Sequence, residues 1–185
     1  MPLRRKRQCS TDYKKRLKLL KSGSHRLVVR ASLKGIIVSL NKYNHEGDVI
    51  EVNVSSNNLS KFGWKSDKGN VPSAYLTGYL AGKIAASKKI QKAILDVGLK
   101  GSVKGSRIYA AVAGAIDGGL EIPQSEEMFP DKERINGSHI SKYAEQIKSD
   151  KEKYELQFGK YLKNNLDPTQ LTKHFEEVKT KISNS

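Results

Sequence analysis

Three apolar, β-branched runs follow one another early in the chain, and they constrain its fold more than any other feature. The runs are "RLVVRAS" from Arg26, "GIIVSL" after Lys34-Gly35, and "DVIEVNVS" from Asp48. The Lys34-Gly35 pair and "NHEG" at 44–47 are short turn segments between the runs. In the third run, apolar residues alternate with mostly polar ones, as in a strand with one buried face. The pattern predicts an antiparallel meander of three strands.

A helical spacing follows the meander. In "PSAYLTGYLAGKIAASKK" the residues Leu76, Leu80 and Ile84 recur every four positions, which predicts a helix. Gly78 and Gly82 lie inside this helix, and each costs about 1 kcal/mol relative to alanine. A helix that keeps both glycines needs another backbone close by. We expect that backbone to be the sheet, with an RNA backbone as the alternative.

Two more strands and a second helix complete the expected body. "KAILDVG" from Lys92 predicts a short buried strand, and "LEIP", which ends at Pro123, predicts another. Between them an apolar stripe predicts a helix, which Ser106 can cap and Gly118-Gly119 can end.

The C-terminal part of the chain shows apolar stripes at helical spacing, and Asp167-Pro168 predicts a helix start. These stripes need a surface to pack on, either the body or a partner. The order of elements predicts an α/β fold: a mixed sheet with an antiparallel N-terminal meander packed by helices, a basic N-terminal arm and a C-terminal helical extension. The expected divisions are an arm at 1–24, a body at 25–128 and a helical extension at 129–185.

Positive charge is concentrated at the N-terminus. The chain has 34 Lys and Arg residues against 19 Asp and Glu residues, a net charge of +15. The first 34 residues hold twelve basic side chains and one acid, Asp12, so they carry +11 of that charge. A localised excess of this kind indicates a polyanionic partner, most often nucleic acid and sometimes an acidic membrane face. A merely well-solvated surface is the alternative.

The single cysteine and the hydropathy pattern limit the expected compartment. Cys9 has no second cysteine with which to form an internal disulfide, which favours a reducing compartment. No apolar run approaches the roughly 20 residues of a membrane-spanning helix, and no apolar stretch follows the basic N-terminus as it would in a secretory signal. We therefore expect a cytoplasmic protein with no membrane partner.

Residue types that perform catalysis are scattered along the chain. The four histidines have no cysteine or carboxylate at metal-ligand spacing, and "GLKGSVKGSRIY" lacks the Gly-Lys-Ser/Thr ending of a phosphate loop. The sharpest alternative is a metal-dependent nuclease of the ribonuclease H type, with Asp96, Asp117 and Glu121 as metal ligands. However, a carboxylate at a helix end more often binds local backbone donors. We expect no enzymatic activity, no cofactor and no small-molecule substrate.

Several motifs together resemble one protein family. "AAVAGAIDGGLEIPQSEEMFP" is similar to the segment "KGAxDGGLxIPHS…FP" of the large-subunit ribosomal proteins that bind 5S rRNA, in their archaeal and eukaryotic form. The other matching motifs, which cover nearly the whole chain in the family's order, are "RRKRQCSTDYKKRLKLLKSG", "RLVVRAS", "GDVIEVNVSS", "LSKFGWK", "NVPSAYLTGYLAG" and "ERINGSHI". Gln124 stands in place of a usual His and Ala113 in place of a common Lys, so each position lacks a potential RNA donor.

The resemblance implies a structural component of the large ribosomal subunit that lies in the central protuberance and has no enzymatic activity. It also implies three partners: 5S rRNA, the large-subunit rRNA and a neighbouring 5S-binding ribosomal protein. An RNA chaperone that acts outside the ribosome is the remaining alternative.

The expected RNA contacts come from the arm and from the body. Arginines of the arm can bind rRNA phosphates bidentately, whereas lysines act as point charges. Tyr13, Phe62 and Trp64 are the expected stacking platforms, although Phe62 and Trp64 could instead cap the core. The arm is expected to become ordered only on RNA. The full set of expected contacts is Arg4, Arg5, Lys6, Arg7, Thr11, Tyr13, Lys14, Lys15, Arg16, Lys18, Lys21, Arg26, Arg30, Lys34, Lys61, Phe62, Trp64, Lys65, Asn70, Tyr75, Lys100, Lys104 and Arg107.

Overall fold

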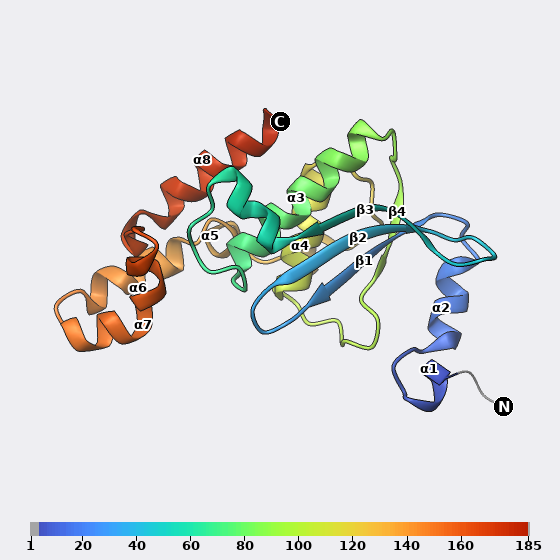
Figure 1. The fold of residues 1–185 in the computed structure, drawn as a ribbon, viewed down its shortest axis with the longest axis horizontal. Coiled ribbons are helices and arrows are strands. Elements are labelled where there is room, and N and C mark those ends of the chain that lie inside the picture. The colour runs from blue at the N-terminus through green and yellow to red at the C-terminus, as the bar shows by residue number, and fades with distance from the viewer. Residues whose placement is uncertain (1–3, 185) are drawn as a thin grey trace.

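A mixed sheet of four strands forms the centre of the body (Figure 1). The computed structural model describes residues 4–184. The strands are β1 (His25–Ala31), β2 (Ile36–Lys42), β3 (Val49–Ser55) and β4 (Ala93–Asp96), in the spatial order β3-β2-β1-β4. Strand β2 pairs antiparallel with both β1 and β3, whereas β4 pairs parallel with β1. The predicted meander and the mixed α/β fold are therefore confirmed.

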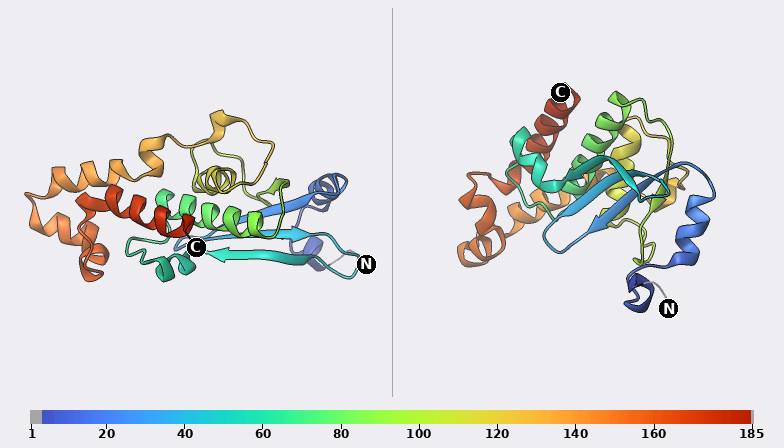
Figure 2. Two further views of the ribbon diagram at one scale, coloured as in Figure 1. Left: turned by 90° about the horizontal axis from the view of Figure 1, so that it is seen from above. Right: turned by 45° about the vertical axis from the view of Figure 1, so that its right-hand side comes forward.

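Helices α3 (Val71–Ser87) and α4 (Arg107–Asp117) cover one face of this sheet, which we call the inner face (Figures 1 and 2). Alternate side chains of the meander point to the inner face because successive residues of a strand alternate between faces. The buried inner-face residues of the meander are Leu27, Val29, Ile36, Val38, Leu40, Val52 and Val54. The opposite face, which we call the outer face, carries Arg26, Val28 and Arg30 of β1.

The two glycines of α3 lie against helix α4, so the expectation that they face the sheet or RNA is wrong. A Cβ added to Gly78 would lie 1.9 Å from the carbonyl oxygen of Ala111, and one added to Gly82 would lie 2.6 Å from that of Ala115. On the α4 side, a Cβ added to Gly114 would lie 2.1 Å from the carbonyl oxygen of Tyr75. Glycines on both helices therefore let the two backbones touch.

One other expectation about the body needs correction. "LEIP" does not form a strand, because only Glu121 pairs with Lys92, in an isolated parallel bridge, and Pro123 has no N–H with which to extend the ladder. The polar segment 56–70 begins with the short helix η1 (Ser56–Phe62). Gly63, in the left-handed conformation at φ 87°, ends η1.

The C-terminal extension is helical, as predicted. Helix α8 (Leu171–Ser183) follows η3 (Pro168–Gln170), which starts directly after Asp167. The apolar stripe of α8 packs on α3 and η1. For this helix, the surface that buries the stripe is therefore the body and not a partner. Helices α6 (Ser138–Ile147) and α7 (Lys151–Lys163) extend away from the sheet (Figure 1), and the elements before them are η2 (Glu126–Met128) and α5 (Lys132–Ile135).

The N-terminal arm contains two short helices, α1 (Arg4–Arg7) and α2 (Tyr13–Leu20). The Asp12 carboxylate caps α2, because it accepts hydrogen bonds from the backbone N–H groups of Lys14 and Lys15 at 2.9 and 3.0 Å. Between residues 4 and 184, no helix is both long enough and apolar enough to cross a membrane.

Candidate nucleic-acid interface

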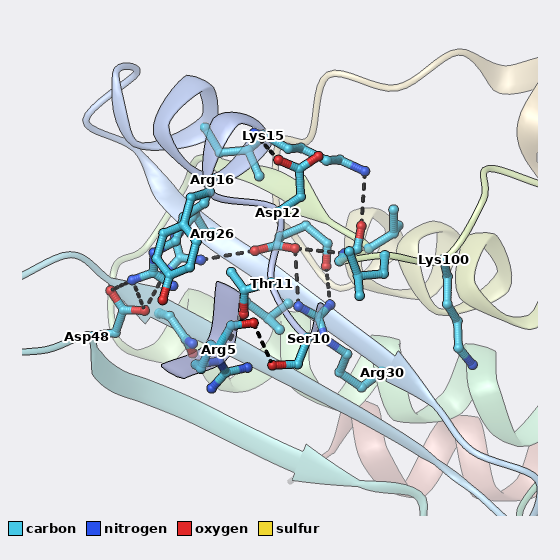
Figure 3. Close-up of a pocket in the computed structure, with 18 residues that line it drawn as sticks. Arg5, Ser10, Thr11, Asp12, Lys15, Arg16, Arg26, Arg30, Asp48 and Lys100 are labelled. Carbon is cyan, nitrogen blue, oxygen red and sulfur yellow. Dashed lines mark hydrogen bonds and ion pairs between the residues drawn. The ribbon is translucent and has the colours of Figure 1, made fainter. Parts of the chain in front are cut away.

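A hollow of about 730 Å³ lies between the arm and the outer face of the sheet (Figure 3). Arg5 and residues near the start of α2 form its arm side. Arg26, Val28 and Arg30 of β1 form the sheet side, and the loop 97–100 after β4 closes one edge. We call this space the arm hollow. Its position shows that the arm is docked along the body.

Three arginines and two aspartates form a continuous chain of ion pairs across the arm hollow (Figure 3). The Nη2 atom of Arg16 in α2 lies 3.0 and 2.9 Å from the carboxylate oxygens of Asp48, in the turn between β2 and β3. Asp48 also pairs with Arg26, whose Nη1 lies 2.9 Å from Oδ2 of Asp96. Arg30 ends the chain, with Nη2 at 3.2 Å from Oδ1 of Asp96. The chain links the arm to strands β1 and β4 and to the turn between β2 and β3, and it leaves one surplus positive charge.

Burial makes this chain a part of the fold. Arg26 is only 2% exposed, and a buried guanidinium needs anionic partners. Burial would raise the pKa of Asp96, but Arg30, the N–H of Gly98 and Arg26 together outweigh it and hold this pKa below its usual value. The carboxylate therefore remains ionised at neutral pH. Because both ends of the Arg26 guanidinium are occupied and buried, the expectation that Arg26 contacts RNA needs correction.

The cations of the arm divide into anchors and free groups. Besides Arg16, Lys15 is an anchor, because its Nζ donates to the carbonyl of Gly98 at 3.1 Å, whereas Arg5 donates through Nε to Thr11 at 2.8 Å within the arm itself. Six other cations are exposed, and their side chains make no hydrogen bond or ion pair with any residue between 4 and 184. They are Arg4, Lys6, Arg7, Lys14, Lys18 and Lys21. These six are the arm's candidate phosphate contacts.

The docked arm differs from the expectation that it becomes ordered only on RNA. Arg16 and Lys15 hold α2 on the body, and Asp12 caps the helix. Neither α1 nor α2 has a buried residue, so apolar packing does not hold the arm on the body. These polar contacts hold it there instead. Tyr13 is partly exposed at the rim of the arm hollow, where its ring can still serve as a stacking platform.

Other predicted cations meet at the turn between β1 and β2. The exposed Lys34 lies in that turn, and Lys100 donates a hydrogen bond to the carbonyl of Ala31. Arg107 donates to the carbonyl of Gly69 at 2.6 Å, close to the same turn. The exposed Lys104 precedes Arg107 at the start of α4. The structure thus brings together residues that are far apart in the sequence.

Two predicted aromatic contacts are buried, so their assignment needs correction. Trp64 is 3% exposed, and its ring stacks on that of His174 at a centroid distance of 5.1 Å. Tyr75 is 2% exposed, and its hydroxyl donates to Asp117 and accepts from Lys179. Burial and the hydrogen bond to Asp117 raise the pKa of Tyr75. Neither ring has a free face for a base, and the alternative that Trp64 caps the core holds in this structure.

The remaining predicted residues lie near the C-terminal helices. The Asn70 side chain caps α3 by accepting from the N–H of Ser73 at 2.9 Å, so its role is structural. Phe62 is partly buried against the core, while Lys61 and Lys65 are exposed. His174 of α8 accepts a hydrogen bond from the Lys65 N–H at 3.1 Å, which places this segment beside α8 and outside the arm hollow.

The structure does not assemble the nuclease site. Asp96 is bound by Arg26 and Arg30, Asp117 accepts from Tyr75, and the exposed Glu121 lies 3.5 Å from Lys92. In the part of the chain from 4 to 184, no three His, Cys, Asp or Glu side chains are grouped so that they could hold a metal ion. The three carboxylates therefore have separate structural partners.

Sequence reasoning missed the aspartates that organise the interface. The sequence patterns place Asp48 only at the start of a strand and Asp96 only among possible metal ligands. The one available signal was that Arg26 and Arg30 lie on one predicted strand, while Asp48 stands at the start of a second strand run and Asp96 near the end of a third. A buried arginine on a strand has to be neutralised by a neighbouring strand or turn.

Comparison with known proteins settles the family. The chain matches the family described as "Ribosomal large subunit proteins 60S L5, and 50S L18" over residues 1–92 and 82–125. It is 45% identical over 184 residues to the large ribosomal subunit protein uL18 of Methanococcus maripaludis, and the match covers 100% of this chain and 95% of the relative. The chain belongs to the L5/L18 family. As a member of the L5/L18 family, it is a structural, non-enzymatic protein of the large subunit of the cytoplasmic ribosome.

Proposed function

We propose that the chain binds 5S rRNA and attaches it to the large rRNA in the central protuberance, beside a neighbouring 5S-binding ribosomal protein. The observation that carries this proposal is the docked arm. Its six free cations are held on the body by Arg16 and Lys15, which join the arm to the turn before β3 and to the loop after β4. Membership of the L5/L18 family makes rRNA the polyanion that such a surface meets.

Phosphate contact supplies most of the affinity in this proposal. Each phosphate that a free cation neutralises releases counterions and steepens the log–log dependence of affinity on salt by roughly 0.7 on single strands and 0.9 on duplex. The deep major groove of A-form RNA hides its base edges, so recognition rests on shape, phosphates, 2′-hydroxyls and unstacked bases. Tyr13 is the arm's candidate platform for one such base.

Docking of the arm also reduces the cost of binding. A disordered arm would lose conformational entropy when it lies on RNA, and this loss would weaken the complex. Here α2 is already helical and fixed by Asp12, Arg16 and Lys15. The free cations Lys14 and Lys18 are four residues apart on α2, so they lie on one side of the helix.

The test is the binding of the full chain to transcribed 5S rRNA and to tRNA, measured across a salt series with excess competitor RNA. The proposal predicts a preference for 5S rRNA of at least tenfold that persists at moderate salt. Equal binding to both RNAs, lost together as salt rises, would overturn it. Sedimentation with ribosomes through a high-salt cushion then separates a ribosomal component, which stays bound, from a transient RNA chaperone, which does not.

A further inference from the structure

A second hollow, of roughly 470 Å³, has four lysines along its walls. Lys42 ends β2, Lys88 and Lys89 follow α3, and Lys92 precedes β4. We call this space the lysine hollow. We propose that it binds the phosphate backbone of a second RNA segment while the arm holds the first. This inference rests on the proposed function and extends it.

The lysine hollow and the arm hollow lie on opposite faces of the sheet. Arg26 and Asn41 are paired in register on β1 and β2, and both line the arm hollow on the outer face. Their chain neighbours, His25 and Lys42, line the lysine hollow. Because successive strand residues alternate between faces, these neighbours point to the inner side, where α3 ends at Ser87. The strand ends therefore separate two cationic sites, each able to meet its own RNA segment.

Local acids leave most of the positive charge of the lysine hollow in place. The Glu51 carboxylate is directed to His25, at 3.1 Å, and Lys88 donates to the Glu51 backbone carbonyl instead. Lys92 lies 3.5 Å from Glu121, but both side chains are exposed, and such a pair is worth little. Lys42 and Lys89 have no side-chain partner between residues 4 and 184.

The backbone at Lys89 gives independent support. Lys89 has φ +60° directly after the C-cap of α3, in the left-handed conformation that glycine usually supplies at this position. A lysine there is strained, and such strain is retained where the side chain has a use. The negative end of the α3 dipole offers a structural reason for Lys88 and Lys89. It does not account for Lys42 and Lys92, which come from other elements.

The test uses the full chain with all four lysines changed to glutamine, K42Q/K88Q/K89Q/K92Q. Biotinylated 5S rRNA is saturated with protein on beads, and capture of labelled protein-free large-subunit rRNA is measured in excess tRNA. We expect the variant to bind 5S rRNA within about twofold of the wild type but to capture at least tenfold less large-subunit rRNA. The matched control removes four exposed lysines of the C-terminal helices, which are Lys151, Lys160, Lys163 and Lys173. This control should capture as much large-subunit rRNA as the wild type.

Three results would overturn the proposal. Unchanged capture would mean that the lysine hollow is not an RNA site and would favour an acidic protein segment as its ligand. An equal loss of 5S rRNA binding would mean that the two hollows form one surface. An equal loss of large-subunit rRNA capture in the control variant would mean that capture depends on the net charge of the chain and not on the lysine hollow.

A generic 20-base-pair RNA duplex separates this proposal from failure of 5S rRNA recognition. Even if the wild type shows no preference for 5S rRNA, the quadruple variant should lower the salt slope on this duplex by about 2, since Lys42 and Lys89, the two lysines without a side-chain partner among residues 4–184, each account for roughly 0.9. An unchanged slope would count against the lysine hollow directly.

The variant Lys89→Gly removes one cation at a backbone position that suits glycine, so it should keep the wild-type melting temperature or exceed it. It should also capture about threefold less large-subunit rRNA, and wild-type capture would contradict a role for Lys89.

Discussion

The guanidinium of Arg16 lies 3.0 and 2.9 Å from the two carboxylate oxygens of Asp48, so the arm is joined to the turn between β2 and β3. Asp48 also neutralises the buried Arg26. A single carboxylate therefore fixes the position of the arm and stabilises the outer face of the sheet. Helix α2 has no buried residue, so its docking depends on polar contacts of this kind.

The substitution Asp48→Asn should release the arm and destabilise the body. It removes the charge that faces Arg16 and leaves Arg26 with Asp96 as its one anionic partner, at an expected cost of about 2 kcal/mol in the free energy of unfolding. Hydrogen–deuterium exchange should speed up across α2, and urea unfolding gives the free energy. Glu145→Gln, at an exposed position of α6, is the matched loss of one acid and should change neither quantity. Unchanged exchange across α2 in the Asp48 variant would contradict this account of docking.

Free and anchoring cations of the arm should behave differently. The double variant K14Q/K18Q removes two exposed groups, so the salt slope of 5S rRNA binding should fall by about 1.5 with no change in melting temperature. Arg16→Gln should lower affinity and also speed exchange across α2, because it breaks the pair with Asp48. Filter binding across a salt series and thermal unfolding distinguish the two variants. If both have the same profile, the division into anchors and free groups does not hold.

Acid should weaken the body through Asp96. The pKa of this carboxyl is below its usual value in the folded chain, so its contribution to stability is present above the unfolded value of about 4 and is lost as the pH falls through the folded value. Urea unfolding between about pH 2 and pH 6 should show this loss below about pH 4. Asp96→Asn should lower stability at pH 6 and flatten the acid side of the curve, whereas the exposed Asp131→Asn should leave its shape unchanged. An Asp96 variant with the wild-type acid slope would rule out this assignment.

The contact between α3 and α4 should not tolerate a methyl group. Gly78→Ala places a Cβ 1.9 Å from the carbonyl oxygen of Ala111, and Gly114→Ala places one 2.1 Å from that of Tyr75. The helices must move apart, at a cost of about 3 kcal/mol or more in either variant. Gly159→Ala in α7 meets no atom within 4 Å and should stabilise the chain by about 0.5–1 kcal/mol. Chemical unfolding measures all three, and a Gly78 variant as stable as the wild type would show that the helices are less close.

The one tryptophan reports on the core. Trp64 is buried beside His174, so its emission should be blue-shifted, protected from iodide and unchanged when 5S rRNA is added. Fluorescence titration tests this, with a free tryptophan derivative as the control for absorption by RNA. Quenching by RNA beyond that control would restore Trp64 as a stacking platform.

Local patterns predicted the elements well because alternation and helical spacing are local properties. The pairing of Val29 with Val38, for example, follows from two apolar runs on either side of a tight turn. The partner of Gly78 could not be predicted in the same way. A glycine in a helix indicates that another backbone lies close to the helix. It does not indicate whether that backbone belongs to a helix, a sheet or an RNA.

The candidate interface was predictable in composition and not in organisation. All cations of the arm look alike in the sequence, although Arg16 is an anchor and Lys14 is free. The difference depends on Asp48, which is 32 residues from Arg16 and meets it only through the fold. Likewise, the burial of Trp64 depends on α8, more than a hundred residues away along the chain.

The most direct test of the central claim is 5S rRNA binding by a chain that lacks residues 1–23, compared with the full chain across a salt series. Circular dichroism should show that the shorter chain folds, because α1 and α2 contain no buried residue and the core begins at Leu27. We expect at least a hundredfold loss of affinity and a salt slope lower by roughly 4, since six free cations are removed. A folded, shortened chain that binds 5S rRNA as tightly as the full chain, with the same slope, would contradict it.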